Sequence, residues 1–551
     1  MITDRTRPLK RGKACFNCRH LKIKCDGQRP MCGPCIRVQK DDPCEYPDTM
    51  SRTQELQETV HRLQSRIEEL QAGPSRNFGS PYPSFSARAS PFSERSAGSG
   101  PSYLSEDVGT FEEPPFPMVQ LLLRSFLAHA PQFGFFLDPQ RFHDAALLPL
   151  PLGDPLRPAP ALLCVVYLWG VHLAKIQPLL SAEPVFLRRA QHYLATALSP
   201  AAAASSNTIL HTIQAQILLG TYLFRTNRLL EAEVHANGAA TLALRYGLHR
   251  IRSARPASPS LSPVSAASSP SLPHPADTLE EGERIRAFWA LAALQVHLCV
   301  ALPGPASAFC VLENAAEIDT PWPLGLADYA AGALHPHYRG EGTVRHLMSE
   351  DTFPPGVPTS VLLAKASVLM FRAIRVAGTA NSPPQARTHL ETRIAQFWQS
   401  LPPTSTAYYA ADSNAARSLA FVHVLIAGAA MRLYSSSPQA QAESGKCVLA
   451  ARSVLQILTS SNTNAGVGAG GDSATVHPVV GSVAAAACKV LIAELRGGGG
   501  GHAQRDAYTR ELNAGMAAMQ GLAAESPFVD YQLQKVKRDW EGVGIGSGRA
   551  V

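Results

Sequence analysis

The sequence has 551 residues, a length that suits roughly three to four domains of about 150 residues each. Hydrophobic residues make up 45% of it, which excludes a wholly disordered chain. The net charge of +7 is uneven, because residues 1–40 hold eleven Lys or Arg side chains and two acidic ones, and the remainder is nearly neutral. A basic balance confined to one short segment predicts a polyanionic partner, with nucleic acid favoured over a membrane surface.

The sequence also gives no reason to expect secretion or insertion into a membrane. No apolar stretch follows Met1, so we do not expect a secretory signal. The longest apolar runs, such as residues 161–174, are shorter than the roughly 18–20 residues that cross a bilayer, and they indicate buried core helices. The sequence therefore predicts a protein without a membrane partner, in a reducing compartment where thiols stay free.

The first residues of the chain form a basic arm over 1–14. Arg11 and Lys13 are its members nearest to the first cysteine, and both are candidate DNA contacts. Such an arm serves either to follow DNA phosphates or as a nuclear import signal, and a solvated tail is the structural alternative.

Six of the eleven cysteines crowd into residues 15–44 with the spacing C-x2-C-x6-C-x6-C-x2-C-x8-C. They are Cys15, Cys18, Cys25, Cys32, Cys35 and Cys44. Two C-x2-C pairs are typical of zinc sites, because a two-residue spacer brings both thiolates to one tetrahedral ion. Six thiolates serve two zinc ions if two of the sulfurs bridge, and nearby basic side chains offset the excess negative charge. The alternative, a disulfide-stapled loop, is disfavoured by a reducing compartment.

The stretch "ACFNCRHLKIKCDGQRPMCGPCIR", followed by "DDPCEYP", resembles the fungal zinc binuclear cluster (Zn2Cys6) transcription factors. The resemblance implies that two Zn²⁺ ions are bound. It also implies that Cys15 and Cys32 bridge the two ions. Cys18 and Cys25 would complete one site, and Cys35 and Cys44 the other. In this family each half is a short helix and an extended strip, joined by a loop with a proline, here Pro30.

The same resemblance implies a DNA-reading surface. The first helix would present its basic residues to the major groove over a CGG-type triplet. Lys22 matches the main base-reading lysine, whose ammonium donates to N7 and O6 of guanine. Arg19 and Lys24 match positions that more often hold phosphates and fix the register. Leu21 stands at a position that is frequently basic in relatives.

After a linker at 45–55, residues 56–72 predict a coiled-coil dimerisation helix that ends at Gly73. Apolar residues recur there at intervals of four and three, at Leu56, Val60, Leu63, Ile67 and Leu70. β-Branched residues at the a positions with Leu at d favour a parallel two-stranded coil. The positions that flank this apolar seam carry almost no charged residues that would select a different partner helix. The pattern is therefore compatible with a homodimer. An amphipathic helix packed on its own chain is the alternative.

Residues 73–115 are rich in Ser, Pro and Gly, and they indicate a disordered linker. Residues 116–495 instead show helical apolar stripes and alanine-rich runs, which predict a large all-α regulatory domain. Disordered inserts interrupt it at 252–276 and 462–475, and residues 496–551 read as a Gly-rich link and a C-terminal tail.

Four stretches of this domain resemble the middle homology region of the same fungal family. They are "NRLLEAEVHANGAATLALRYGLHR" (227–250), "EEGERIRAFWAL" (280–291), "IDTPWP" (318–323) and "HPVVGSV" (477–483). Gln295 lies near a place where relatives more often carry an acidic residue.

Signs of an enzyme are weak. "GVGAGG" (466–471) fits G-x-G-x-x-G but follows no strand, so a flexible loop is the better interpretation. No H-E-x-x-H pair and no G-x-S-x-G elbow occurs. His172, His211 and His423 sit among apolar helical residues and indicate core histidines. We therefore expect no catalytic residues and no enzyme activity.

Together these patterns predict a mainly α protein with an N-terminal zinc cluster, a short coiled coil and an all-α regulatory domain. The predicted function is a nuclear, sequence-specific regulator of RNA polymerase II transcription. It would bind double-stranded DNA as a homodimer and have the transcription machinery as a further partner. The alternatives are a zinc-stapled helical scaffold that binds proteins, and an enzyme within the helical domain that carries the cluster as an accessory.

Overall fold

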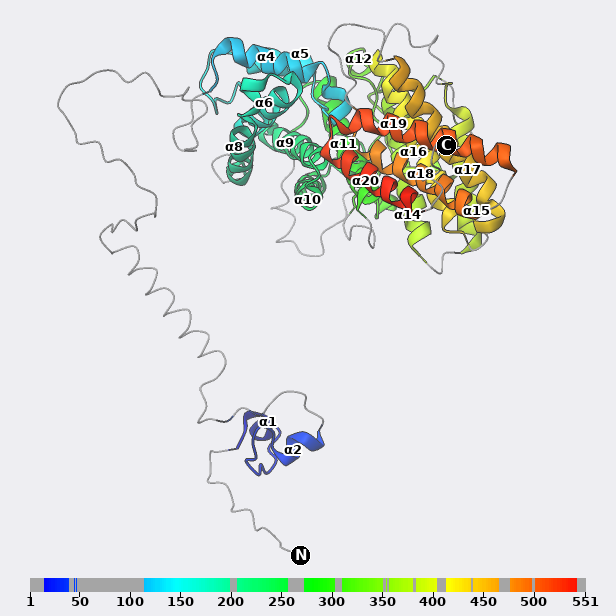
Figure 1. The fold of residues 1–551 in the computed structure, drawn as a ribbon. Coiled ribbons are helices and arrows are strands. Elements are labelled where there is room, and N and C mark those ends of the chain that lie inside the picture. The colour runs from blue at the N-terminus through cyan, green and yellow to red at the C-terminus, as the bar shows by residue number, and fades with distance from the viewer. Residues whose placement is uncertain are drawn as a thin grey trace, which may run out of the picture. The chain divides into compact units, whose positions relative to one another are not determined.

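The structure, a computed structural model, describes fourteen separate stretches or single positions of the chain. They are 14–38, 44, 46, 113–198, 206–255, 272–302, 310–349, 353, 356–379, 383–403, 413–437, 440–464, 476–497 and 501–542. These residues fall into two compact units, one within 1–96 and the other within 97–551. Both units are built from helices (Figure 1), which confirms the predicted mainly α fold. Outside the helices, one isolated parallel bridge joins Ser253 and Gly340.

The described residues of the N-terminal unit include two short helices, α1 (Phe16–His20) and α2 (Gly33–Arg37). Each helix starts directly after a cysteine, so that Cys15 and Cys32 are the N-cap residues. The core of the unit is made of cysteine side chains and Tyr46. The described part of this unit is shorter than about 40 residues, and its apolar core is small. A folded unit of that size usually needs a metal, a disulfide or a partner to be stable.

The first half of the C-terminal unit is a group of helices around α6. Its elements are α4 (Phe116–Leu127), η3 (Ala130–Phe133), α5 (Pro139–Ala146), α6 (Pro160–Ala174), α7 (Gln177–Leu180), α8 (Glu183–Thr196), α9 (Ser206–Arg225), α10 (Leu229–Arg245) and η4 (Leu248–Arg250). Every residue of α6 from Ala161 to Val171 is buried. A helix that is apolar all round has to be enclosed by others, and α6 is packed against α4, α8 and α9.

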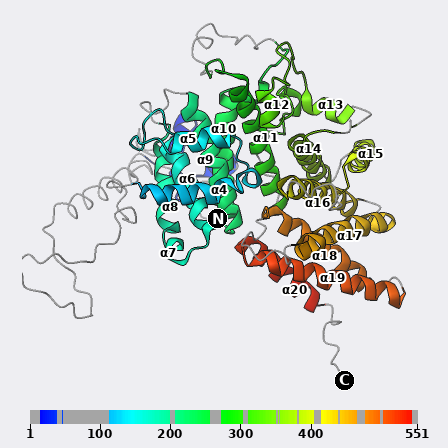
Figure 2. The same cartoon turned by 90° about the horizontal axis from the view of Figure 1, so that it is seen from above.

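The second half begins with the long helix α11. Its elements are α11 (Thr278–Ala301), η5 (Ala315–Glu317), α12 (Leu326–Ala330), α13 (Thr343–Ser349), α14 (Thr359–Gly378), α15 (Pro384–Ser400), α16 (Ser413–Ser435), α17 (Ala440–Asn464), α18 (Val479–Arg496), α19 (His502–Ala523) and α20 (Pro527–Glu541). Asp277 caps α11 by accepting the Glu280 backbone N–H at 2.8 Å. Helix α11 contacts α9 and α10 on one side and α14 and α18 on the other, so it connects the two halves (Figure 2).

The helical unit extends past residue 495, because α19 and α20 pack against α17 and α18 where the sequence indicates a link and a tail. Helix α19 buries only four residues, among them Gly515 and Ala518, so its apolar stripe is hard to see in the sequence. A side chain on Gly515 would meet Leu455 at 2.8 Å, which shows how closely the two helices approach. At the other end, Glu113 of the predicted linker pairs with buried Arg157 through two contacts of 2.7 Å.

Of the three histidines that the sequence indicates as core residues, His423 is buried, and His172 and His211 are half-buried. Trp169 is fully buried and donates to the Leu218 carbonyl at 3.0 Å. His211 accepts the backbone N–H of Ala159 at 3.2 Å, and burial lowers the pKa of this imidazole to about 4. These contacts give each ring a structural role. The "GVGAGG" segment lies outside the described residues.

Two described helices are long and apolar enough to cross a membrane, which the sequence analysis did not anticipate. They are Thr278–Ala301 and Ala415–Ser435, whose most apolar windows are 83% and 67% buried inside the unit. Core helices of water-soluble proteins pass the same test of length and composition. Their burial among other helices is consistent with that role.

A buried polar network at Arg225 joins the two halves. The Arg225 side chain is 2% exposed, and its Nε donates to His172 Nε2 at 3.1 Å. His172 in turn contacts Glu183 through Nδ1 at 2.9 Å. On the other side, Arg225 pairs with Glu525 at 3.3 Å, and the Ser526 hydroxyl donates to the Arg225 carbonyl at 2.9 Å. Burial lowers the pKa of Arg225, and Glu525 opposes that shift.

Replacing this arginine tests whether the network stabilises the helical unit. We expect Arg225→Met to lower the free energy of unfolding by roughly 3 kcal/mol, because its buried acceptors lose their donor. Urea unfolding of the full-length protein, followed by helical circular dichroism, measures the change. Arg228→Met is the matched control, since its pair with Glu231 is exposed and is worth less than about 1 kcal/mol. Equal changes for the two variants would contradict the role given to Arg225.

Candidate metal centre and nucleic-acid interface

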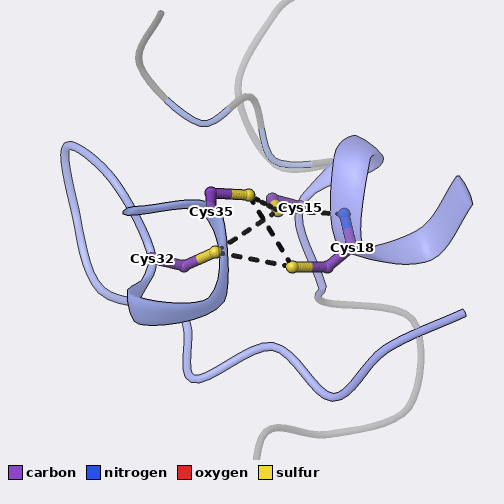
Figure 3. Close-up of side chains that lie close together, drawn as sticks. All are labelled: Cys15, Cys18, Cys32 and Cys35. Atoms are coloured by element: carbon purple, nitrogen blue, oxygen red, sulfur yellow. Dashed lines mark hydrogen bonds between the residues drawn. The ribbon is translucent and has the colours of Figure 1, made fainter. Parts of the chain in front are cut away.

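Four cysteine sulfurs converge between α1 and α2. Cys15 and Cys18 face Cys32 and Cys35 (Figure 3), and all four sulfurs lie within 4.8 Å of one another. The Sγ atom of Cys32 is 3.8 Å from that of Cys15 and 3.5 Å from that of Cys18. A tetrahedral zinc ion with Zn–S bonds of about 2.3 Å separates its sulfurs by about 3.8 Å. The buried sulfurs therefore fit a zinc–thiolate site.

The two remaining cysteines of the cluster lie beside Cys32. Cys44 Sγ is 3.7 Å from Cys32 Sγ. Cys25 Sγ, Cys32 Sγ and an oxygen of Asp26 form a second group within 4.8 Å. Cys32 is thus near the sulfurs of all five other cluster cysteines. All six are free thiols, which disfavours the disulfide alternative.

One distance departs from the ligand pairing implied by the resemblance. Cys18 and Cys35 would belong to different zinc ions, yet their sulfurs are 3.8 Å apart. The same separation holds for Cys15 and Cys35, which would share an ion. The structure therefore brings together a four-cysteine group, with Cys25 and Cys44 next to it.

The protonation of these thiols differs with their surroundings. Burial raises the pKa of Cys18 to about 12 and also raises that of Cys32. The Asn17 side-chain amide donates to Cys35 Sγ at 3.3 Å and lowers the pKa of Cys35 to about 6. Zinc ligation requires thiolates, so a cation has to compensate for the burial of Cys18 and Cys32.

Backbone and carboxylate hydrogen bonds hold the two halves of the cluster in place. Asp26 accepts the backbone N–H of Gly33, the first residue of α2, at 2.9 Å. A side chain on Gly33 would come within 2.5 Å of that carboxylate, so a larger residue here would displace the Asp26 side chain. The Tyr46 hydroxyl donates to the Gln28 carbonyl at 2.7 Å. The sequence analysis missed Asn17, Asp26 and Tyr46, although "DG" after the third cysteine is a turn signal.

The predicted DNA contacts sit at and just after the end of α1. Arg19 is in the last turn of the helix, and Lys22 and Lys24 follow it. All three side chains are exposed. The helix ends at His20, so Lys22 lies in a left-handed turn (φ 52°) rather than on the helix as the resemblance implied.

The other predicted site residues cannot be placed. Arg11 and Lys13 of the basic arm lie outside the described residues. So do the predicted dimerisation residues Leu56, Val60, Leu63, Ile67 and Leu70.

Two known proteins each share a short stretch of sequence with this chain. A 48-residue stretch is 42% identical to chromatin structure-remodeling complex protein RSC30 of Saccharomyces cerevisiae, and it covers 9% of this chain and 5% of that protein. A 65-residue stretch is 40% identical to transcriptional activator protein acu-15 of Neurospora crassa, and it covers 10% of this chain and 7% of that protein. The matches thus span a small part of each relative.

A family match defines one region of the chain. Residues 13–53 match the family described as "Fungal Zn(2)-Cys(6) binuclear cluster domain". The matched residues include all six clustered cysteines. They also include the exposed side chains of Arg19, Lys22 and Lys24 at and after the end of α1, which we call the basic turn. Residues 13–53 of the chain are therefore a member of this domain family.

Proposed function

We propose that this protein is a zinc-dependent, sequence-specific DNA-binding regulator of RNA polymerase II transcription that acts in the nucleus. The observation that carries the proposal is the exposed basic turn, which the cysteine cluster holds next to α1. One relative is named as a transcriptional activator and the other as part of a chromatin-remodeling complex, and both names support work on a DNA template.

The basic side chains of this turn are suited to two kinds of DNA contact, one with base edges and the other with phosphates. Lys22 is exposed, and its left-handed backbone follows directly on α1. Its ammonium group can donate to both acceptors on the major-groove edge of a guanine. Arg19 and Lys24 flank it and are suited to phosphate contacts, which position the protein without reading sequence. We infer that this surface recognises a CGG-type triplet.

Zinc would serve as the structural cross-link of this unit. Bound at the cluster, two Zn²⁺ ions would neutralise most of the charge of six thiolates and join α1 to α2. Cys15 and Cys32 would bridge the ions, and the position of Cys32 near every other sulfur of the cluster supports this. Folding of the unit is then coupled to metal binding.

A dimer would recognise two triplets, and therefore a longer DNA site than one unit recognises. Residues 56–72 would pair two copies through the seam of Leu and β-branched residues. Linking two reading units makes the second contact intramolecular, which raises affinity by about 10²–10⁴-fold when the geometry permits. The large helical unit would then act as the regulatory part of the protein.

Metal analysis tests the cluster. We expect two zinc ions per chain in the purified protein, and loss of both in Cys32→Ser, because this sulfur lies beside all the others. Cys447→Ser, in the helical unit, should leave the zinc content unchanged. Elemental analysis with protein quantification provides the measurement. One zinc per wild-type chain would instead favour a mononuclear site of Cys15, Cys18, Cys32 and Cys35.

DNA binding tests the reading surface. Lys22→Ala should lose about 1–3 kcal/mol on a CGG duplex and should relax base preference. Lys24→Ala should weaken binding to all sequences more evenly, because phosphates carry no sequence information. Fluorescence anisotropy with CGG and scrambled duplexes at fixed salt distinguishes the two effects. If wild-type protein bound both duplexes equally, the scaffold alternative would be favoured over sequence-specific recognition.

The dimer seam can be tested without disturbing the cluster. Leu63→Glu places a charge in the seam, so binding to paired triplets should fall at least tenfold while binding to a single triplet stays nearly unchanged. Ser65→Glu adds the same charge outside the seam and should bind like the wild type. Equal binding of paired triplets by both variants would show that the protein reads DNA as a monomer.

A further inference from the structure

Leu21 is an exposed apolar residue in the middle of the basic turn. It caps the C-terminus of α1, and its backbone N–H donates to the Asn17 carbonyl at 2.9 Å. Its side chain remains 46% exposed. The apolar cluster of this unit consists of cysteines and Tyr46, with Ala14 packed against it, and Leu21 is not part of that cluster. Packing among the described residues of this unit therefore does not account for a leucine at this position.

The neighbours of Leu21 indicate which partner covers it. Arg19 precedes it, Lys22 follows it directly, and both side chains are exposed. Adjacent Cα atoms lie about 3.8 Å apart, close to the 3.4 Å rise between stacked bases. A duplex whose guanine is contacted by Lys22 would therefore have a neighbouring base step within reach of Leu21.

The second half of the unit offers a useful contrast. Counted from the first cysteine of each half, Ile36 and Val38 stand where Arg19 and Leu21 stand in the first half. Ile36 and Val38 are also exposed, at 55% and 60%. Residues 15–31 hold four Lys or Arg side chains and one acidic residue, whereas residues 32–44 hold two Lys or Arg side chains and two acidic residues. The charge thus directs a polyanion to Leu21 rather than to Val38.

The chemistry of the groove then narrows the choice of base. Base edges in the major groove offer hydrogen-bond donors and acceptors, and thymine adds a C5-methyl group. A leucine side chain neither donates nor accepts hydrogen bonds. The methyl group of thymine is the feature of the groove that such a side chain can select by contact.

We propose that Leu21 is a specificity-determining residue that selects thymine at the base step next to the guanine read by Lys22. The inference rests on the proposed function and adds to it a base preference outside the CGG-type triplet. A basic residue at this position would favour guanine or a phosphate instead.

Exchange of thymine for deoxyuridine tests this contact, because it removes the methyl group alone. Full-length protein loaded with zinc is first used to select its preferred duplex from random sequence. Each thymine beside the triplet is then replaced singly by deoxyuridine. At one position wild-type affinity should fall about fourfold, the effect expected for one methyl group left without contact. Leu21→Ala should bind the two duplexes equally.

Three variants control for folding and for the neighbouring apolar residue. Leu21→Met keeps an apolar side chain and should retain the preference for thymine. Leu21→Gln has a similar size but is polar, and it should lose that preference. Ile23, 41% exposed, is the matched control, so Ile23→Ala should discriminate like the wild type. The zinc content of each variant reports that the unit is folded.

The outcomes separate this inference from the proposed function. If selection yields a CGG-type site but deoxyuridine costs wild-type protein nothing, or costs Leu21→Ala as much, Leu21 does not read thymine. Loss of discrimination in Ile23→Ala alone would assign the reading to Ile23 and overturn the proposal. If wild-type protein prefers no sequence over random duplex, the proposed function itself fails.

Discussion

The close packing of buried cysteine sulfurs determines the structure of the N-terminal unit, and with it which side chains the unit exposes. Its core is made of thiols, and four of their Sγ atoms lie within 4.8 Å of one another. Thiolates packed so closely repel one another, and burial makes a thiol harder to ionise. A cation is therefore required to hold the sulfurs together as thiolates. Among the described residues, the turn that carries Leu21 and Lys22 has no other core beneath it, so metal bound at the cysteines would determine its shape.

The helical unit depends on a different interaction, the enclosure of long apolar helices. Helices α6 and α11 are buried along most of their length, and the elements around them supply the polar surface. Arg225 adds a polar link between the halves, because one buried side chain contacts His172 and Glu525. The chain thus combines a small unit stabilised by metal with a large one stabilised by hydrophobic burial.

The sequence predicted what depends on local spacing. The C-x2-C spacing predicted that the cysteines come together, and the family resemblance implied a short helix in each half. Helices α1 and α2 are present, each with one cysteine of a pair at its N-cap and the other in its first turn. Contacts between distant residues were not predictable in this way. The Asp26 carboxylate reaches the start of α2 seven residues later, and α19 packs through small residues that leave a weak periodic signal. The ion stoichiometry and the middle homology region remain predictions.

The repeat within the N-terminal unit has a consequence for how a duplex is approached. Both halves use the same start, a cysteine followed by a five-residue helix, so the backbone is close to repeating itself. The side chains do not repeat, because Arg19 and Leu21 of one half correspond to Ile36 and Val38 of the other. The unit is therefore directional: turned end for end on a duplex, it would present the aliphatic Ile36 where it had presented the cationic Arg19, and a bound strand would be read in one polarity.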